Sequence, residues 1–124
     1  MSTAALIGAL LAFLGVALGA FGAHGLSTRV QDEQIKTYQT GVQYQLIHGV
    51  AAWAAGMFAA ILPRAGLLPL AAWLFIVGIV LFSGSLYALT AERLPRRLGV
   101  ITPIGGLCFL AGWALLALQM LHGV

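Results

Sequence analysis

The sequence predicts an all-α integral membrane protein, a four-helix bundle whose chain runs up and down through the bilayer. Of its 124 residues, 61% are hydrophobic and only 7% are charged, whereas a soluble globular chain has about 25% charged residues. The sequence also holds four uncharged apolar runs, each as long as the ~20 residues that a helix needs to cross the hydrocarbon core. Short polar or proline- and glycine-containing segments separate these runs. We therefore expect a single membrane domain over residues 1–124.

The four apolar runs are the predicted membrane spans. They cover about residues 4–23, 41–62, 67–91 and 100–121. Each is expected to be helical, because backbone groups in lipid must find hydrogen-bond partners within their own segment. The first run lacks the basic start of a secretory signal peptide, since no Lys or Arg precedes Arg29. We therefore interpret it as a true span rather than a cleaved leader.

The segment before the second span is predicted to be helical as well. Val30, Ile35 and Tyr38 recur at near-helical spacing with charges between them, and Asp32 and Glu33 suit a first helical turn, where the helix dipole favours acidic side chains. We expect a helical extension that starts near Gln31 or Asp32. It either lies along the membrane interface or joins the second span directly.

The basic residues predict the orientation of the chain. Five of them fall in the first and third connecting segments and one falls in the second: Arg29, Lys36, Arg93, Arg96 and Arg97 against Arg64. Because Lys and Arg concentrate in cytoplasmic loops, the first and third loops are expected in the cytoplasm and both termini outside, with the protein in the cell (inner) membrane. The six basic residues lie in short segments between the spans, and we therefore predict no surface that binds nucleic acid.

Small residues recur along the spans at helical spacing. In lipid, such residues let helix backbones approach closely. In the first span they form one stripe, Gly8, Ala12, Gly15, Gly19 and Gly22, and in the fourth Gly105 and Gly112 lie seven apart. We expect these glycines to pack helices within the bundle, with a stripe on the second span as the counterpart: Gly41, Gln45, His48, Ala52, Ala55 and Ala59. An alternative use of the Gly15–Gly19 pair, a GxxxG motif, is homodimerisation.

Polar residues inside membrane spans form the candidate site. Such residues are costly in lipid and often mark function. The predicted topology brings seven of them toward the cytoplasmic surface: His24, Tyr44, Gln45, His48, Ser83, Tyr87 and Thr102. We interpret Thr102, which precedes Pro103, as the N-cap of the fourth span.

The polar cluster has more than one interpretation. Its members can satisfy one another across the bundle, or they can line a pocket for a headgroup, a quinone or an ion. A bis-histidine haem or metal site is disfavoured, because His48 should lie about 10 Å deeper than His24 at 1.5 Å of rise per residue. We therefore predict no metal site and no cofactor. Trp53 and Trp113 fall near mid-bilayer, where we expect packing or lipid contact.

Four segments together resemble a known family. They read GAFGAHGL, YQTGVQYQLIHGVA, LFSGSLYAL and GVITPIGGLCFLAGW. In this order they are similar to the YgdD/YwdK-like family of small inner-membrane proteins of unknown function, which has eukaryotic relatives. The resemblance covers nearly the whole chain and implies a four-span bundle without an agreed activity. One departure is VQDEQI, where the family usually has Ser/Thr-Pro-Glu, so the start of that helix is less well defined.

The sequence contains no catalytic motif, and we predict a protein that is not an enzyme. The leading interpretation is a structural or accessory membrane protein that packs with lipid, as a homo-oligomer or within a larger membrane complex. The alternatives are a small-solute or ion permease that acts as an oligomer, and a quinone- or haem-linked redox component. A permease is disfavoured because it needs charged or polar residues at mid-depth, and we expect none there below His48.

Overall fold

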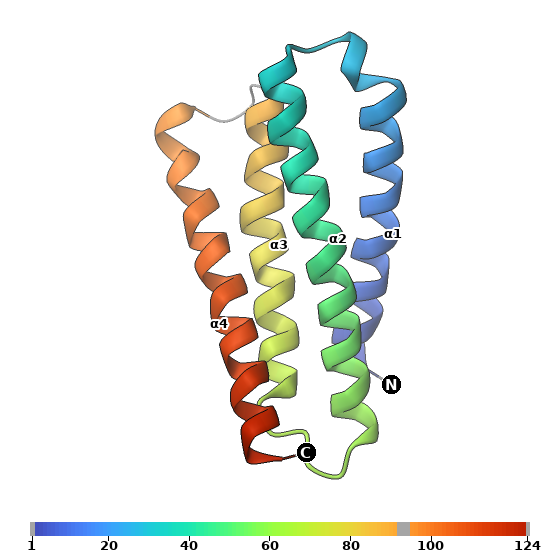
Figure 1. Ribbon diagram of the computed structural model, residues 1–124, viewed down its shortest axis with the longest axis vertical. Helices are drawn as coiled ribbons and strands as arrows, with labels where there is room; N and C mark the ends of the chain where they lie inside the picture. Colours follow the sequence, from blue (N-terminus) through green and yellow to red (C-terminus); the bar gives the residue numbers. More distant parts are fainter. Residues whose placement is uncertain (1, 92–94, 124) are drawn as a thin grey trace.

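The structure is a computed structural model that describes residues 2–91 and 95–123. The described residues contain four long helices, two short 3-10 helices and no strand. The long helices are each long and apolar enough to cross a membrane, which confirms the predicted fold class. In chain order the elements are α1 (Thr3–His24), η1 (Leu26–Thr28), α2 (Asp32–Ile61), α3 (Leu68–Thr90), η2 (Arg96–Val100) and α4 (Ile101–His122), shown in Figure 1.

The expected helical extension joins the second span directly. α2 is one helix of 30 residues, about 45 Å long at 1.5 Å per residue, and therefore longer than the ~30 Å hydrocarbon core. It begins at Asp32 with Asp32 and Glu33 in its first turn. The side-chain oxygen of Gln34 accepts a hydrogen bond from the backbone N–H of Gln31 at 2.9 Å. This bond stabilises the first turn of α2 at the predicted start.

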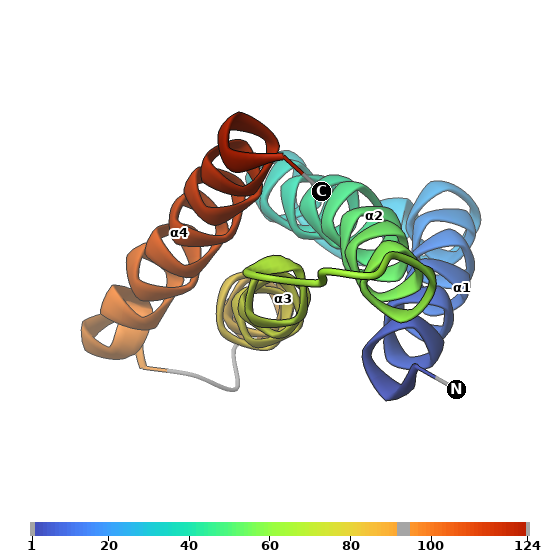
Figure 2. The same ribbon diagram turned by 90° about the horizontal axis from the view of Figure 1, so that it is seen from below.

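The two central helices are α2 and α3, and the flanking helices are α1 and α4. α1 packs along α2, and α4 packs along α3, so that the two flanking helices lie on opposite sides (Figure 2). Alanine and isoleucine side chains and the rings of Phe75 and Phe109 fill the centre, and Ala52, Ala71 and Phe75 are fully buried. The outer faces of α1 and α4 carry exposed Leu and Phe side chains, such as Phe13 and Leu110, as expected for helices that face lipid.

The glycine stripe of α1 lies against α2. A methyl group at Gly8 would be 2.5 Å from the backbone nitrogen of Trp53, and one at Gly22 would be 2.5 Å from the Tyr38 ring. Between these points, Gly15 faces Leu46 and Gly19 faces Val42. The GxxxG pair is therefore covered by a helix of the same chain.

The counterpart stripe expected on α2 was wrong in part. Gly41 faces the Tyr87 ring on α3, not α1. The α2 glycines that meet α1 are Gly49, beside the backbone of Ala12, and Gly56, beside the backbone of Ala5. On a helix with three protein neighbours, small residues can serve different partners.

Glycines also set the contact between α3 and α4. A methyl group at Gly105 would be 2.4 Å from the backbone nitrogen of Phe82, and one at Gly112 would be 2.6 Å from the Phe75 ring. On the other side of this contact, Gly78 accommodates the Phe109 ring. Rings from one helix thus lie over glycines of the other.

Candidate polar site

His48 forms the polar link between α2 and α4. Its Nε2 atom accepts the indole N–H of Trp113 at 3.0 Å, and an indole nitrogen can only donate. The proton of the neutral ring must therefore lie on Nδ1, which is 2.8 Å from the Tyr44 carbonyl oxygen and donates to it. Both ring nitrogens are thus occupied by partners within the protein.

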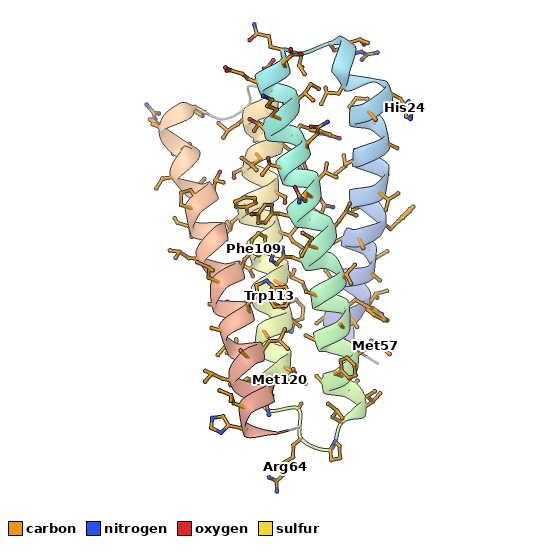
Figure 3. All side chains as sticks on the ribbon, in the orientation of Figure 1. His24, Met57, Arg64, Phe109, Trp113 and Met120 are labelled. Atoms are coloured by element: carbon orange, nitrogen blue, oxygen red, sulfur yellow. The ribbon has the colours of Figure 1, made fainter. Side chains whose placement is uncertain are left out.

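Aromatic rings surround His48. Its ring stacks on Phe109 of α4 with a centroid distance of 3.7 Å and an interplanar angle of 12°, beside Trp113, which is one turn further along α4 (Figure 3). Tyr44 lies one turn before His48 on α2, with its ring nearly parallel to the imidazole. Phe75 approaches from α3 at 5.6 Å between centroids. These contacts bury all but 4% of the histidine.

Gln45 lies three residues before His48 but forms hydrogen bonds with α1 and α3 instead of α4. Its amide nitrogen donates to the carbonyl oxygen of Leu11 on α1 at 2.8 Å. Its amide oxygen accepts the Tyr87 hydroxyl of α3 at 2.6 Å. One buried side chain therefore joins α1, α2 and α3.

Two further hydroxyl groups reinforce this network through backbone carbonyls. Ser83 of α3 donates to the Gly41 carbonyl oxygen of α2 at 2.6 Å. Tyr38 of α2 donates to the Leu18 carbonyl oxygen of α1, and its ring packs against Tyr87 at 5.3 Å between centroids. A carbonyl oxygen has two lone pairs, so these bonds add to the helical bonds rather than replace them.

Thr102 is not the N-cap of the fourth span, and that prediction was wrong. α4 begins at Ile101 with Val100 as its cap residue, because the 3-10 helix η2 runs directly into it. Pro103 still lies in the first turn, where backbone N–H groups have no helical acceptor. The Thr102 hydroxyl instead bonds that of Ser85, at 2.5 Å, and joins α4 to α3.

The structure divides the seven predicted site residues rather than gathering them. His48 faces α4, and the Tyr44 ring contacts Phe82 of α3 and Phe109 of α4. Gln45, Ser83 and Tyr87 lie instead among α1, α2 and α3. Thr102 lies in the contact between α3 and α4. His24 is exposed at the end of α1, away from the other six (Figure 3), so it does not share a site with His48.

Two polar partners in α4 were not predicted from the sequence. Trp113 was expected only to pack or to contact lipid, but it donates the hydrogen bond that holds His48. Gln119 is buried near the other end of α4, where it accepts the Leu67 N–H at 2.7 Å and donates to the Gly123 carbonyl oxygen at 3.0 Å. A lone amide inside an apolar span was the signal that could have identified Gln119.

The hydrogen bonds decide what these groups can do chemically. Among the described residues, no buried side-chain nitrogen or oxygen lacks a partner. The same part of the chain holds no group of three or more His, Cys, Asp or Glu side chains close enough to share a metal ion. The arrangement is suited to holding four helices together, because its donors and acceptors are used between helices.

Comparison with known proteins decides the family. A model of the family described as "Protein of unknown function (DUF423)" matches residues 18–106. The chain belongs to this family. It is 42% identical to the UPF0382 membrane protein YwdK of Bacillus subtilis over 90% of this chain and 89% of that one. It is also 45% identical to a UPF0382 membrane protein of Haemophilus influenzae, over 88% of this chain and 86% of the relative.

The DUF423 family extends to eukaryotes. The UPF0382 membrane protein C1782.12c of fission yeast is 41% identical, over 87% of this chain and 92% of its own length. No solved structure matches the chain. The resemblance expected from the four sequence motifs is confirmed, and the protein is a membrane protein of a family to which no activity is assigned.

Proposed function

We propose that this protein is a non-catalytic structural component of the cell (inner) membrane that packs with lipid or with other membrane proteins. The observation that carries the proposal is the internal use of its polar groups: every buried polar side chain in the described residues has a hydrogen-bond partner. Gln45 and His48, the two most polar groups at the centre, each bond to groups within the chain through both of their polar atoms.

This pattern argues against a transport pathway within one chain. A solute or ion path needs polar atoms that can exchange partners as the solute passes. Here the acceptors of Gln45, Ser83 and Tyr38 are backbone carbonyl oxygens of neighbouring helices. Breaking these bonds would separate helices rather than open a gate.

The positions of the histidines also weigh against a haem held by this chain alone. His48 has Trp113 on Nε2, the nitrogen directed toward α4. His24 is exposed on the opposite flank of the bundle (Figure 3). Two histidines placed in this way cannot ligate one iron in one protein chain.

The proposed orientation has both termini outside and the first and third loops in the cytoplasm. Basic residues support it, because Arg29 and Lys36 lie at one end of the bundle and Arg64 lies at the other. Labelling of single cysteines from outside intact cells tests it, in a Cys108→Ala background. We expect reaction at His122→Cys and none at Thr28→Cys, and the reverse pattern would contradict this orientation.

The test of the structural role is the substitution His48→Gln, which keeps one donor and one acceptor. We expect the variant to fold, with a modest fall in melting temperature. We also expect it to retain the visible absorption spectrum and the co-purifying lipids of the unchanged protein. Melting temperature, absorption and lipid mass spectrometry on one preparation give the three readouts.

A matched variant separates structure from ligand binding. Gln45→Met keeps the approximate size of the second central amide but can neither donate to the Leu11 carbonyl oxygen nor accept the Tyr87 hydroxyl as the amide does, so it should reduce stability more than His48→Gln does. If His48→Gln instead folds normally but loses a bound chromophore or a specific small molecule, His48 belongs to a ligand site and the structural proposal is wrong.

A further inference from the structure

An apolar groove separates α2 from α4 at the end of the molecule that holds both termini. Its volume is about 330 Å³, and all of its lining residues are hydrophobic. Ala51 and Ala54 line it on α2, and Met120 lines it on α4. Leu68, which is almost fully buried, forms part of its floor. The groove exists because α4 packs on α3 rather than on α2 (Figure 2). Part of the α2 face directed toward α4 therefore stays uncovered at this end of the molecule.

The groove has the length of one leaflet of a bilayer. On α2 its lining extends from Ala51 to Leu62, about 16 Å at 1.5 Å per residue, and half of a ~30 Å hydrocarbon core is about 15 Å. Trp113 marks its inner end, where the indole is held by His48. A hydrocarbon chain that enters from one membrane surface would therefore end near mid-bilayer.

Of the Lys and Arg residues that the structure describes, Arg64 is the one at the end of the molecule where the groove reaches the membrane surface. Arg64 follows Leu62 by two residues in the loop between α2 and α3, and its side chain extends beyond the end of the bundle, on the same side as Met120 (Figure 3). The acidic side chains of the sequence are Asp32, Glu33 and Glu92, and none of them lies in this loop or near the termini. In the part of the chain that the structure describes, no carboxylate side chain lies at the same end of the molecule as Arg64.

We propose that this groove binds one acyl chain of an anionic glycerophospholipid whose phosphate contacts Arg64. The membrane supplies the ligand, the groove matches the length of its chain, and the guanidinium matches the charge and the bidentate geometry of a phosphate. The proposal goes beyond a general structural role, since it assigns a specific lipid class to one site. It requires only that Arg64 and the groove share one end of the bundle, and it holds for either orientation in the membrane.

The lining of the groove favours a plain hydrocarbon chain over a quinone ring. A quinone needs hydrogen-bond donors for its carbonyl oxygens. The Trp113 indole N–H is the one side-chain donor among the lining residues, and it is already used by His48. An acyl chain needs no donor, so it leaves this bond intact.

Native mass spectrometry of the purified, delipidated protein tests the proposal. The probes are dioleoylphosphatidylglycerol, which is anionic, and dioleoylphosphatidylcholine, which has the same chains and no net charge. We expect the protein to bind the anionic lipid about fivefold more tightly, as one basic residue at a membrane surface contributes. Glycerol 3-phosphate, which has the phosphate but no chains, should not bind measurably.

Two pairs of variants locate the site. Arg64→Gln should abolish the preference for the anionic lipid, whereas Arg29→Gln, which removes an exposed charge at the opposite end, should retain it. Ala54→Leu fills the groove and should weaken binding of both lipids. Ala117→Leu adds the same group to an exposed position on α4 outside the groove and should not. If Ala54→Leu fails to fold, Ala51→Leu replaces it.

The outcomes decide the proposal in each direction. Equal lipid preferences in Arg64→Gln and Arg29→Gln would overturn the headgroup assignment. Equal binding by the groove-filling variant and by Ala117→Leu would overturn the groove. Arg64 lies outside the polar site, so failure of the Arg64 test leaves the structural role of His48 intact.

Discussion

α2 packs against α1 and approaches α4, and these two interfaces are built in different ways. Toward α1, glycines bring backbone against backbone: methyl groups at Gly8 and Gly56 would lie 2.5 and 2.7 Å from backbone nitrogens of the other helix. Toward α4, the contact is made by side chains, with His48 hydrogen-bonded to Trp113 and stacked on Phe109. Beyond that contact the two helices leave a groove of about 330 Å³.

The difference shows that a small membrane bundle can join one pair of helices by backbone contact and another pair by side-chain contact. Helix association in lipid depends on close packing and on polar bonds rather than on burial of apolar surface from water. Where glycines line both helices, as at Gly8 and Gly49, the two backbones are in direct van der Waals contact, and the hollows between α1 and α2 lie beside this contact. Where one aromatic contact holds the helices, the space beyond it remains accessible to an acyl chain.

The largest expected effect is on the α1–α2 interface. Gly8→Ala places a methyl group against the backbone of Trp53 and the carbonyl oxygen of Gly49, and neither can rotate away. Overpacking typically costs about 1–3 kcal/mol, and we expect a value in the upper part of this range. The measurement is the free energy of unfolding in mixed micelles.

A glycine without neighbours provides the control for Gly8→Ala. Nothing lies within 4 Å of a methyl group at Gly84. Gly84→Ala should therefore be neutral or stabilise the helix by up to about 1 kcal/mol. Gly19→Ala, which meets only a Val42 side chain at 3.2 Å, should fall between the two. Equal effects at Gly8 and Gly84 would mean that the stripe of α1 does not set this interface.

Removal of the central amide should have the second largest effect. Gln45→Leu loses the bonds to Leu11 and Tyr87. At about 0.6 kcal/mol for an average bond between membrane helices, the loss should be about 1.2 kcal/mol. Gln43→Leu is the matched control, because Gln43 is exposed on the same helix, and it should leave the melting temperature nearly unchanged. A larger loss in the Gln43 variant would contradict the assigned network.

The α2–α4 contact should respond more weakly. Trp113→Phe keeps an aromatic ring but removes the donor to His48, and we expect a loss of about 0.6 kcal/mol. Trp53→Phe is the control, since Trp53 and Trp113 are each 45% exposed. A fall in melting temperature for Trp113→Phe that exceeds the fall for Gly8→Ala would reverse the comparison between the two interfaces.

The smallest effect concerns one proton and involves no change in stability. In the unchanged protein, the nitrogen chemical shifts of His48 should show the neutral ring with its proton on Nδ1. This follows because Nε2 accepts from Trp113 and Nδ1 donates to Tyr44. Trp113→Phe removes the donor to Nε2 but leaves the Tyr44 carbonyl oxygen as the acceptor of the Nδ1 proton, so the Nδ1 tautomer should remain while the Nε2 chemical shift moves toward that of an unbonded acceptor nitrogen. A spectrum in which Nε2 carries the proton before substitution would exclude the Trp113 bond.

Local sequence patterns predicted the helices well. The observed helices Thr3–His24 and Leu68–Thr90 differ by one residue at each end from the predicted spans 4–23 and 67–91. The stripe that includes Gly8, Gly15 and Gly22 lies on one face because a helix repeats every 3.6 residues. Such features need only the chain's own hydropathy and period, and so they follow from the sequence.

The partners of each face required the tertiary structure. Gln45 and His48 lie three residues apart, and the sequence analysis placed both on one stripe, yet Gln45 faces α1 and α3 while His48 faces α4. His24 was grouped with them and is exposed on the far flank. In a soluble helix, the apolar side identifies the core; here every side is apolar, so hydropathy does not distinguish protein from lipid.

The sequence by itself determined four membrane-spanning helices, their order, the start of α2 near Asp32 and the small residues that allow close packing. Only the tertiary structure decided that α4 lies on α3 and meets α2 through His48 and Trp113, and that a groove remains beyond them. The physical reason is that span length and period are properties of one helix. The choice of neighbour depends on how well two whole surfaces fit, and that fit is fixed only when the four helices pack together.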